Sequence, residues 1–497
     1  MIRQGPLAGR YPAAAAMVMF ALIPYLALSA AIGPVTPIIA RQLHTSLQTL
    51  SLGSGLGNAA YAVGTVLAVQ FAQHLPQRRM MVLYVVLLVL GSVLEAAAQS
   101  PGTFIAGHVL QGLCTSLLLI AAVPPLALGF GAEKLRYTAV IMSMCIFGAV
   151  ALGPVVGGLQ AGANAWRPLF WVIAGISATA LVLSLLTFED APPADASAPV
   201  APVAIALAAV GPVAAFYGAS QLLTHKFVEG RTLAPLLGGL AVIVTLIVYQ
   251  YRARRPLLTI RSMLSSTIPV AGIVIALFAA AASVSASALT ASLLAGRYSA
   301  LHVGLLYLPE LAGAVLTAIA LGIVIETRRL QYLPLVGMAF LAAGIGVFRI
   351  ELPPTQGLTL AGSALTGIGL GATVAPALFA AGFSLPAANL QRVFAIVEMM
   401  RAVAAFMIAP IFAHFAATVG GNATNGTGIA LWIGLGLALG GGALAVLIYV
   451  LGGARPQTPD MEAFLGGEGP GWPSPPLLDA VRSRSLRPRQ VEEAARP

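Results

Sequence analysis

Ionisable side chains inside long apolar stretches are the residues of this sequence whose types could do chemistry. Three carboxyl groups and one guanidinium group fall there, namely Glu95, Glu310, Glu398 and Arg401. An ionised group at the centre of a hydrocarbon layer costs at least about 3 kcal/mol, so each is a candidate for carrying ions or protons. The sequence therefore points first to ion or proton movement through a membrane.

Spacing separates the paired from the unpaired groups. Glu398 and Arg401 are three residues apart, so they would share a helix face and could neutralise each other, or serve only to fix helix packing. Glu310 follows Pro309 and has no cation nearby in the sequence. A carboxyl group in an apolar setting is readily neutral when no cation is close, as a proton carrier requires. We therefore predict Glu310 as the coupling residue.

Histidine adds a second kind of proton-transfer group. His108 lies in an apolar segment and is followed by Gln111 and Gly112. Imidazole titrates near neutral pH and could pass protons, although a hydrogen-bonded structural histidine would leave the same pattern. Glu95 lies about as far before the intervening turn as His108 lies after it. The two side chains could therefore meet at one depth.

The composition excludes a soluble protein. Apolar residues make up 59% of the 497 residues and charged residues 8%, whereas soluble domains carry about 25% charged residues. Both cysteines lie in apolar segments, so we expect no disulfide, no metal site and no cofactor. The formal charge of +10 comes from scattered basic residues. Orientation in a membrane explains them better than nucleic-acid binding, so nucleic acid is not an expected partner.

Fourteen segments have the length of about 20 apolar residues that a bilayer core demands. They predict an all-α membrane protein. The first segment is too long for a signal-peptide core and is interpreted as a retained helix. The segments lie near residues 15–40, 50–72, 80–99, 103–128, 138–160, 167–187, 201–221, 232–251, 267–294, 302–325, 331–349, 357–382, 390–417 and 427–452.

Loop charges and composition predict the topology and the domains. Lys and Arg are concentrated in the loops of one side, which places both termini in the cytoplasm. The acidic, Pro/Ala-rich stretch from residue 189 to 202 suggests a flexible linker. The tail suggests disorder, with a basic part that either touches anionic lipid or has no function. The predicted domains are a six-helix bundle (1–190), a linker with a two-helix insert (191–262), a second six-helix bundle (263–452) and a disordered cytoplasmic tail (453–497).

One segment combines small residues with a proline. It contains Gly148, Gly153, Pro154, Gly157 and Gly158. Gly153 and Gly157 are four residues apart and share a helix face, so another backbone can approach closely. A general packing face would show the same spacing.

This segment, followed by Trp166-Arg167-Pro168-Leu169-Phe170, resembles the fifth-helix antiporter motif of the major facilitator superfamily. The Trp-Arg start of the next helix is typical of the fourteen-helix drug:proton antiporter branch. The resemblance implies the major facilitator fold, with two six-helix bundles and a two-helix insert. It also implies that the small-residue segment is a close-packed hinge between the two bundles that limits proton leak.

Some positions depart from the family pattern. Gln111 and Gly112 match the helix-four motif Arg-x-x-Gln-Gly, but His108 stands in place of the arginine implicated in proton relay. Leu28 occupies the position where the branch usually has an acid in helix one. Gln73 replaces the acid of the loop after helix two. These changes weaken the transfer of the family's usual coupling mechanism.

Basic residues near two loops are candidates for a cytoplasmic gate. Of the charged residues that form the family's clasp after helix two, only Arg78 and Arg79 are present here. A partial counterpart after the tenth segment keeps Glu326 beside Arg328 and Arg329. Simple topology signals explain these charges equally well, because surface ion pairs contribute only about 0 to 1 kcal/mol.

The resemblance implies a secondary active transporter that exports a hydrophobic or amphipathic, drug-like small molecule by proton antiport with alternating access. The Gly-x-x-x-x-Gly-Lys-[Ser/Thr] motif is absent from the sequence, so an ion gradient would supply the energy. We expect no enzymatic activity, a monomer in a bacterial plasma membrane, and a small-molecule substrate, protons and lipid as partners. The alternatives are an exporter of an endogenous lipid or siderophore-like metabolite, an importer, an uncoupled sensor or scaffold, and a membrane enzyme such as an acyltransferase, for which the histidines are too dispersed.

Overall fold

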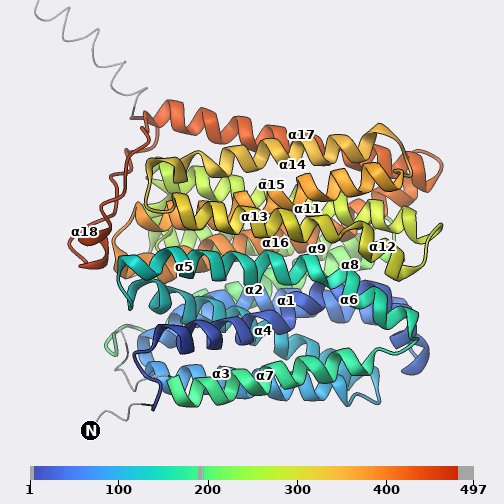
Figure 1. Cartoon of the computed structure of the whole chain (residues 1–497), viewed down its shortest axis with the longest axis horizontal. Coiled ribbons are helices and arrows are strands. Elements are labelled where there is room, and N and C mark those ends of the chain that lie inside the picture. Colours follow the sequence, from blue (N-terminus) through green and yellow to red (C-terminus); the bar gives the residue numbers. More distant parts are fainter. Residues whose placement is uncertain (1–4, 188–192, 194, 480–497) are drawn as a thin grey trace, which may run out of the picture.

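The computed structural model describes residues 5–187, 193 and 195–479, without the side chains of residues 223, 284 and 285. Long helices run side by side along one direction (Figure 1). Fourteen spans in this part of the chain are long and apolar enough to cross a membrane. The predicted all-α membrane fold is therefore confirmed.

Six spans form the first part of the chain, and the fifth of them contains a π-helical turn. They are α1 (Tyr11–Gln42), α2 (Leu47–His74), α3 (Gln77–Ala96), α4 (Pro101–Leu128), the composite span of α5 (Ala132–Ser143), η1 (Met144–Gly148) and α6 (Ala149–Gly162), and α7 (Arg167–Thr187). Each overlaps its predicted segment. The largest difference is at α5, which begins at residue 132 instead of near 138.

The remaining eight spans follow in the predicted order. They are α8 (Pro202–Ser220), α9 (Gly230–Arg252), α11 (Thr267–Ala295), α12 (Ala300–Leu306) with α13 (Leu308–Val324), η3 (Arg328–Gln331) with α14 (Leu333–Ile350), α15 (Gln356–Phe383), η4 (Ala387–Asn389) with α16 (Leu390–Thr418), and α17 (Ala423–Gly452). Three short elements complete the described chain, η2 (Gln221–Leu223), α10 (Ile260–Leu264) and α18 (Met461–Leu465).

Side-chain caps begin several spans at the end predicted to be outside. Ser46, Ser100, Thr355 and Asn422 each accept a hydrogen bond from the backbone N–H three residues later. Such a cap satisfies a backbone donor that the helix itself leaves free and contributes about 1 kcal/mol. The local sequence therefore fixes where these four helices begin.

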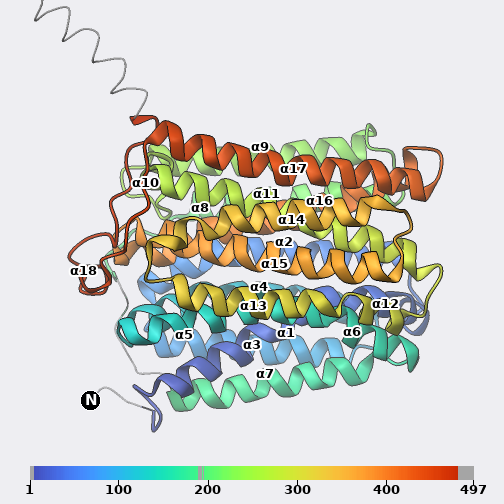
Figure 2. The ribbon, with the colours of Figure 1, turned by 45° about the horizontal axis from the view of Figure 1, so that its top comes forward.

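Two groups of helices meet along a seam. Helices α1 to α7 contact one another, and so do α11 to α17. Across the seam, α6 contacts α12, α5 contacts α13, and α2 contacts α16. Figure 2 shows α5 and α6 beside α13 and α12. The residue boundaries of the predicted bundles stay a prediction.

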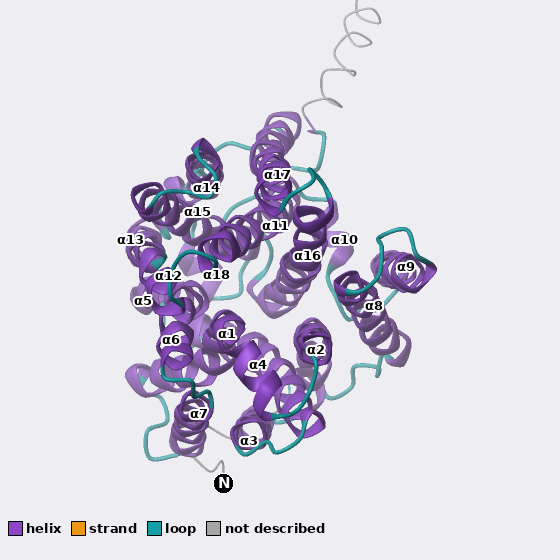
Figure 3. Cartoon of the chain, turned by 90° about the vertical axis from the view of Figure 1, so that its right-hand side faces the viewer, coloured by secondary structure: helices purple, strands orange, loops and turns teal. Residues whose placement is uncertain are grey.

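Helices α8 and α9 form a pair beside the seam. They contact each other, and α8 also contacts α2 and α16 (Figure 3). His414 on α16 contacts the carbonyl oxygen of Leu222 at 3.0 Å, and Gln48 of α2 donates to Thr224 at 3.0 Å. The loop that follows α8 therefore touches a helix from each group.

The predicted topology can be tested by labelling single cysteines at the two ends of α9. We expect a cysteine at Val228, which is 77% exposed, to react with a membrane-impermeant maleimide added to intact cells. A cysteine at Arg254, which is also exposed, should react only after the membrane is opened. Cys114 and Cys145 are buried and provide little background. The opposite labelling pattern would reverse the predicted orientation.

Part of the predicted flexible linker is fixed in place. The backbone N–H of Asp195 donates to the carbonyl oxygen of Gln73 at 3.2 Å, and Nε2 of His74 lies 2.9 Å from the carbonyl oxygen of Ala198. Hydrogen bonds from Ser197, with smaller effects of Arg255 and Arg392, lower the pKa of the Asp195 carboxyl group. These contacts hold residues 195–201 against the end of α2. Residues 188–192 and 194 of the linker lie outside the described residues.

The prediction of a disordered tail does not hold for its first half. Residues 461–465 form α18, and the side chains of Phe464 and Trp472 are buried. Composition suggested disorder because Pro and Gly are frequent, but aromatic residues in the same segment find a docking site. Residues 480–497, with the clustered arginines, lie outside the described residues.

Candidate functional site

A buried ion pair with a tyrosine lies across the seam. Glu398 and Arg401 share a face of α16, and two guanidinium nitrogens donate to Oε2 of Glu398 at 2.9 and 2.7 Å. The hydroxyl of Tyr61, from α2, donates to the same Oε2 at 3.1 Å. Glu398 is fully buried and Arg401 is 8% exposed. The charges are thus neutralised by each other, as their spacing indicated, and the pair is held to the other group of helices.

Tyr61 is a site residue that sequence reasoning missed. It lies in α2 among small and apolar residues, and nothing in its local sequence marks it. Its hydroxyl group also accepts a hydrogen bond from Arg401 at 3.3 Å. The contact joins residues more than 300 positions apart, so only the folded structure could show it.

Aromatic rings continue from this cluster into the first group of helices. The ring of Tyr61 stacks on Tyr25 with centroids 6.0 Å apart, and Tyr25 lies 5.4 Å from the His108 ring. The Tyr25 hydroxyl donates to the side-chain oxygen of Asn58 at 2.6 Å. A row of polar and aromatic groups therefore extends from α16 through α2 and α1 to α4.

The structure brings Glu95 and His108 together. Nδ1 of His108 lies 2.9 Å from Oε1 of Glu95, and both side chains are almost fully buried. The other carboxyl oxygen, Oε2, has no hydrogen-bond partner among the described residues. A buried carboxyl group with one free oxygen is poorly compensated as a full charge, so this pair can share a proton between the two side chains.

Neighbouring hydroxyl and amide groups on α3, α4 and α7 form hydrogen bonds with one another. Gln111 donates to the Ser92 hydroxyl at 3.0 Å, and Ser92 lies 3.0 Å from Ser177 on α7. Gly112 allows α4 and α2 to touch, because a Cβ there would lie on the backbone of Gly57. The helix-four motif residues are therefore packing and orienting positions in the structure.

Glu310 lies in the first turn of α13 and differs from the other two carboxylates. Its side chain is part-buried, and within the described chain its carboxylate has neither an ion pair nor a hydrogen bond. A Cβ on Gly367 would lie 2.7 Å from the Glu310 Cα, so α13 and α15 touch at this point. The next residue, Leu311, lies close to Gly148 across the seam. Glu310 is thus an unpaired acid beside the contact of the two groups.

The small-residue segment makes two different contacts, which corrects the predicted hinge. Gly153 and Gly157 face α1, because a Cβ at either would collide with Ala30 or Ala31. This contact lies within the first group of helices. The contact across the seam comes from Gly158, where a Cβ would lie 2.6 Å from the carbonyl oxygen of Ala300 on α12.

Pro154 and Gly148 also lie at the seam. A Cβ on Gly304 of α12 would lie 2.5 Å from the Pro154 carbonyl oxygen. Because proline has no N–H, Pro154 leaves a carbonyl group one turn earlier without its helix partner. The π-helical turn η1 ends at Gly148, shortly before that turn. The segment is therefore closely packed on both sides, with a local irregularity at its start.

Within the described residues, the candidates for a cytoplasmic gate form no ion pair with one another. Glu326, Arg328 and Arg329 are exposed, and the described chain shows no ion pair between Glu326 and either arginine. Arg78 donates to the carbonyl oxygen of Leu185 at 3.3 Å, while Arg79 is exposed. A gating role of these residues stays a prediction. No group of three or more His, Cys, Asp or Glu side chains in the described residues could hold a metal ion.

Fourteen apolar spans with buried ionisable groups at a seam define a polytopic membrane protein of the transporter class. The family model of the Major Facilitator Superfamily matches residues 18–327. The chain therefore belongs to this superfamily. Its family and fold are those of transporters, not of enzymes.

Curated relatives are similar at low identity. The Bacillus subtilis (strain 168) "Uncharacterized MFS-type transporter YubD" is 24% identical over 80% of this chain and 79% of its own length. A "Multidrug resistance protein B homolog" of Mycobacterium tuberculosis (strain ATCC 25618 / H37Rv) is 27% identical over 61% of this chain and 57% of its own. The "Drug efflux pump JefA" of the same strain is 25% identical over 72% of both chains.

Solved structures share the fold. The proton:xylose symporter XylE superposes with a TM-score of 0.60 at 13% identity, covering 88% of this chain and 95% of that chain. The human organic anion transporter MFSD10 gives a TM-score of 0.59 at 13% identity, covering 88% and 99%. At this identity the likeness concerns the fold alone.

Proposed function

We propose that the protein exports hydrophobic or amphipathic small molecules by alternating access, in exchange for protons, as a monomer in a bacterial plasma membrane. Membership of the superfamily and the names of the efflux relatives support the transport class. The observation that best supports proton coupling is that Glu310 is unpaired within the described residues. Among the acids in spans that are not exposed, it is the one that has no cationic partner in the described residues, while Glu398 and Glu95 are paired.

The contrast between the three acids decides which can change its protonation. A guanidinium group 2.7 Å from Glu398 stabilises the charged carboxylate, so removing its charge would leave Arg401 uncompensated. Glu310 has no such penalty, because no cation depends on it. Its side chain is part-buried, whereas those of Glu398 and Glu95 are fully buried. Glu310 therefore binds and releases the transported proton.

The cluster of Tyr61, Glu398 and Arg401 has a different role in this scheme. It joins α2 to α16 across the seam through one hydrogen bond from the Tyr61 hydroxyl to the Glu398 carboxylate and one from Arg401 to that hydroxyl. When the two groups of helices rock against each other, these bonds must shift or break. The cluster therefore stabilises one conformation of the cycle.

The hydroxyl group of Tyr61 can be tested by Tyr61→Phe. Hydrogen bonds to charged groups contribute about 1.5–3 kcal/mol, so we expect a lower thermal unfolding midpoint in detergent. The Glu398–Arg401 ion pair stays intact, so the protein should still fold. Tyr217→Phe on α8 is the matched control, because that side chain is 48% exposed. Equal midpoints for both variants would contradict the cross-seam role of Tyr61.

The Glu95–His108 pair is a second candidate for the proton site. A contact of 2.9 Å between an imidazole and a carboxyl group with a free oxygen supports it. Both side chains of this pair are almost fully buried, whereas Glu310 is part-buried. Loss of proton coupling in His108→Gln with normal coupling in Glu310→Gln would favour this pair.

Transport in proteoliposomes tests the proposal against the remaining functions. An imposed pH gradient should drive uptake of amphipathic dyes into inside-out vesicles, and dye addition should release protons. A panel of cationic, neutral and anionic dyes would show the preferred charge. Dye movement without proton movement would favour an uncoupled carrier. Binding without movement of dye or of extracted lipids would favour a sensor or scaffold.

A further inference from the structure

The segment after α17 lies against the start of α11. The carbonyl oxygen of Pro475 accepts from the Thr267 N–H at 3.0 Å, and the Ser474 hydroxyl accepts from the Ile268 N–H at 3.0 Å. The Leu477 N–H donates to the carbonyl oxygen of Ser265 at 2.9 Å. The two N–H groups are donors that the start of α11 leaves unpaired, and the Ser265 carbonyl is an acceptor at the end of α10, so the tail pairs all three.

Two aromatic side chains anchor the same segment to the end of α15. Phe464 and Trp472 pack edge-on against Phe383, with ring centroids 5.1 and 5.9 Å away. Phe464 is fully buried and Trp472 is 1% exposed. The backbone N–H of Trp472 donates to the Phe383 carbonyl oxygen at 3.3 Å. The start of α11 and the end of α15, which hold the tail, both belong to the second group of helices.

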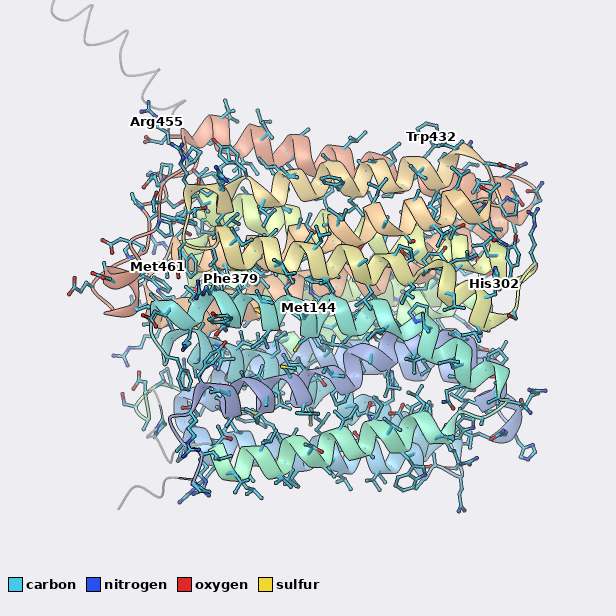
Figure 4. All side chains as sticks on the ribbon, viewed as in Figure 1. Met144, His302, Phe379, Trp432, Arg455 and Met461 are labelled. Carbon is cyan, nitrogen blue, oxygen red and sulfur yellow. The ribbon has the colours of Figure 1, made fainter. Side chains whose placement is uncertain are left out.

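The short helix α18, which contains Phe464, reaches the other group. It contacts α5, at the same end of the molecule where α5 begins (Figure 1). Met461, at its first position, lies at that end in Figure 4 and is 7% exposed. The tail therefore bridges the seam at the end predicted to be cytoplasmic.

Helices α4, α15 and α16 each contain a long run of buried residues toward this end of the molecule. Residues 114–124 of α4, 371–383 of α15 and 393–399 of α16 are buried without a break. An unbroken run of buried positions means that all faces of a helix are covered, not one stripe. The seam is thus closed at the end where the tail bridges it.

We propose that residues 453–479 form a latch that holds the cytoplasmic end of the transporter closed. This rests on the proposed alternating access, in which that end must open once in each cycle. The latch is anchored on the second group, so opening requires α18 to leave α5. The packing of Phe464 and Trp472 on Phe383 lies within the second group and is kept when α18 leaves α5.

Distances between spin labels on the two groups test the latch without measuring transport. Cysteines replace Glu133 at the start of α5 and Tyr332 at the start of α14, which are both exposed. The native cysteines are buried and stay unlabelled. We expect one short distance in the parent protein and an added longer-distance population in Phe464→Ala and Trp472→Ala.

A milder variant and a control keep the test decisive. The Asp460 carboxylate caps α18 by accepting a hydrogen bond from the Ala463 N–H at 3.1 Å. Asp460→Ala removes this cap and should shift the distances in the same way without opening a cavity. Glu468→Ala changes an exposed residue of the same segment and should leave the distances unchanged. Unchanged distances in all three latch variants, while pH or dye changes them in the parent, would overturn the latch. Distances that no condition changes would instead contradict the alternating access on which the latch rests.

Discussion

Glu310→Gln is expected to abolish transport driven by a pH gradient and to leave substrate binding and counterflow exchange largely intact. Glutamine matches the size of the protonated acid but cannot release a proton. Because the carboxylate has no partner within the described chain, the substitution breaks no ion pair or hydrogen bond there. Driven dye uptake should therefore fall to the rate measured without a gradient. Proteoliposomes with and without an imposed pH gradient provide the measurement.

Two controls make this result specific to Glu310. Glu351→Gln changes an exposed acid in a loop and should keep the full gradient response. Glu310→Asp retains a titratable group and should keep part of it. Wild-type driven transport by Glu310→Gln would reject the assignment and direct attention to Glu95 and His108 or to an uncoupled carrier.

The fold was predictable because hydrophobic length is a property of single segments. The bilayer requires about 20 apolar residues in each span, and these are separated by loops with charge or turn residues. Two side-chain contacts were also accessible to sequence reasoning. Glu398 and Arg401 are neighbours on one helix, and Glu95 and His108 lie at similar distances from one turn. Local geometry alone fixes such pairs.

The parts that sequence reasoning missed depend on contacts between distant segments. Tyr61 completes the Glu398 cluster from a helix more than 300 residues earlier. The Gly153 and Gly157 spacing correctly indicated a close contact but could not say which helix makes it. Trp472 and Phe464 dock in a tail whose composition favours disorder, because burial of aromatic surface offsets the chain entropy. In each case the contact joins segments that are far apart in the sequence, so local patterns could not show it.

Gly157→Leu is expected to reduce transport sharply while the protein still inserts into the membrane. A Cβ alone at Gly157 would collide with the backbone of Ala31, so a leucine must push α1 and α6 apart. Overpacking of this kind costs about 1–3 kcal/mol. Because this contact lies within one group of helices, its loss should also lower the thermal unfolding midpoint. Dye transport, membrane content and the midpoint are the measurements.

Two further glycines of the same segment distinguish packing within a group from packing across the seam. Gly162 has no heavy atom within 4 Å of a built Cβ, so Gly162→Leu should leave transport and the midpoint unchanged. Gly158 faces the backbone of α12, and a leucine there wedges the two groups apart instead of distorting one of them. We therefore expect Gly158→Leu to impair transport with a smaller fall in the midpoint than Gly157→Leu. Normal transport by Gly157→Leu would show that the close contact with α1 is not required, and equal effects of all three substitutions would show that the response does not depend on these contacts.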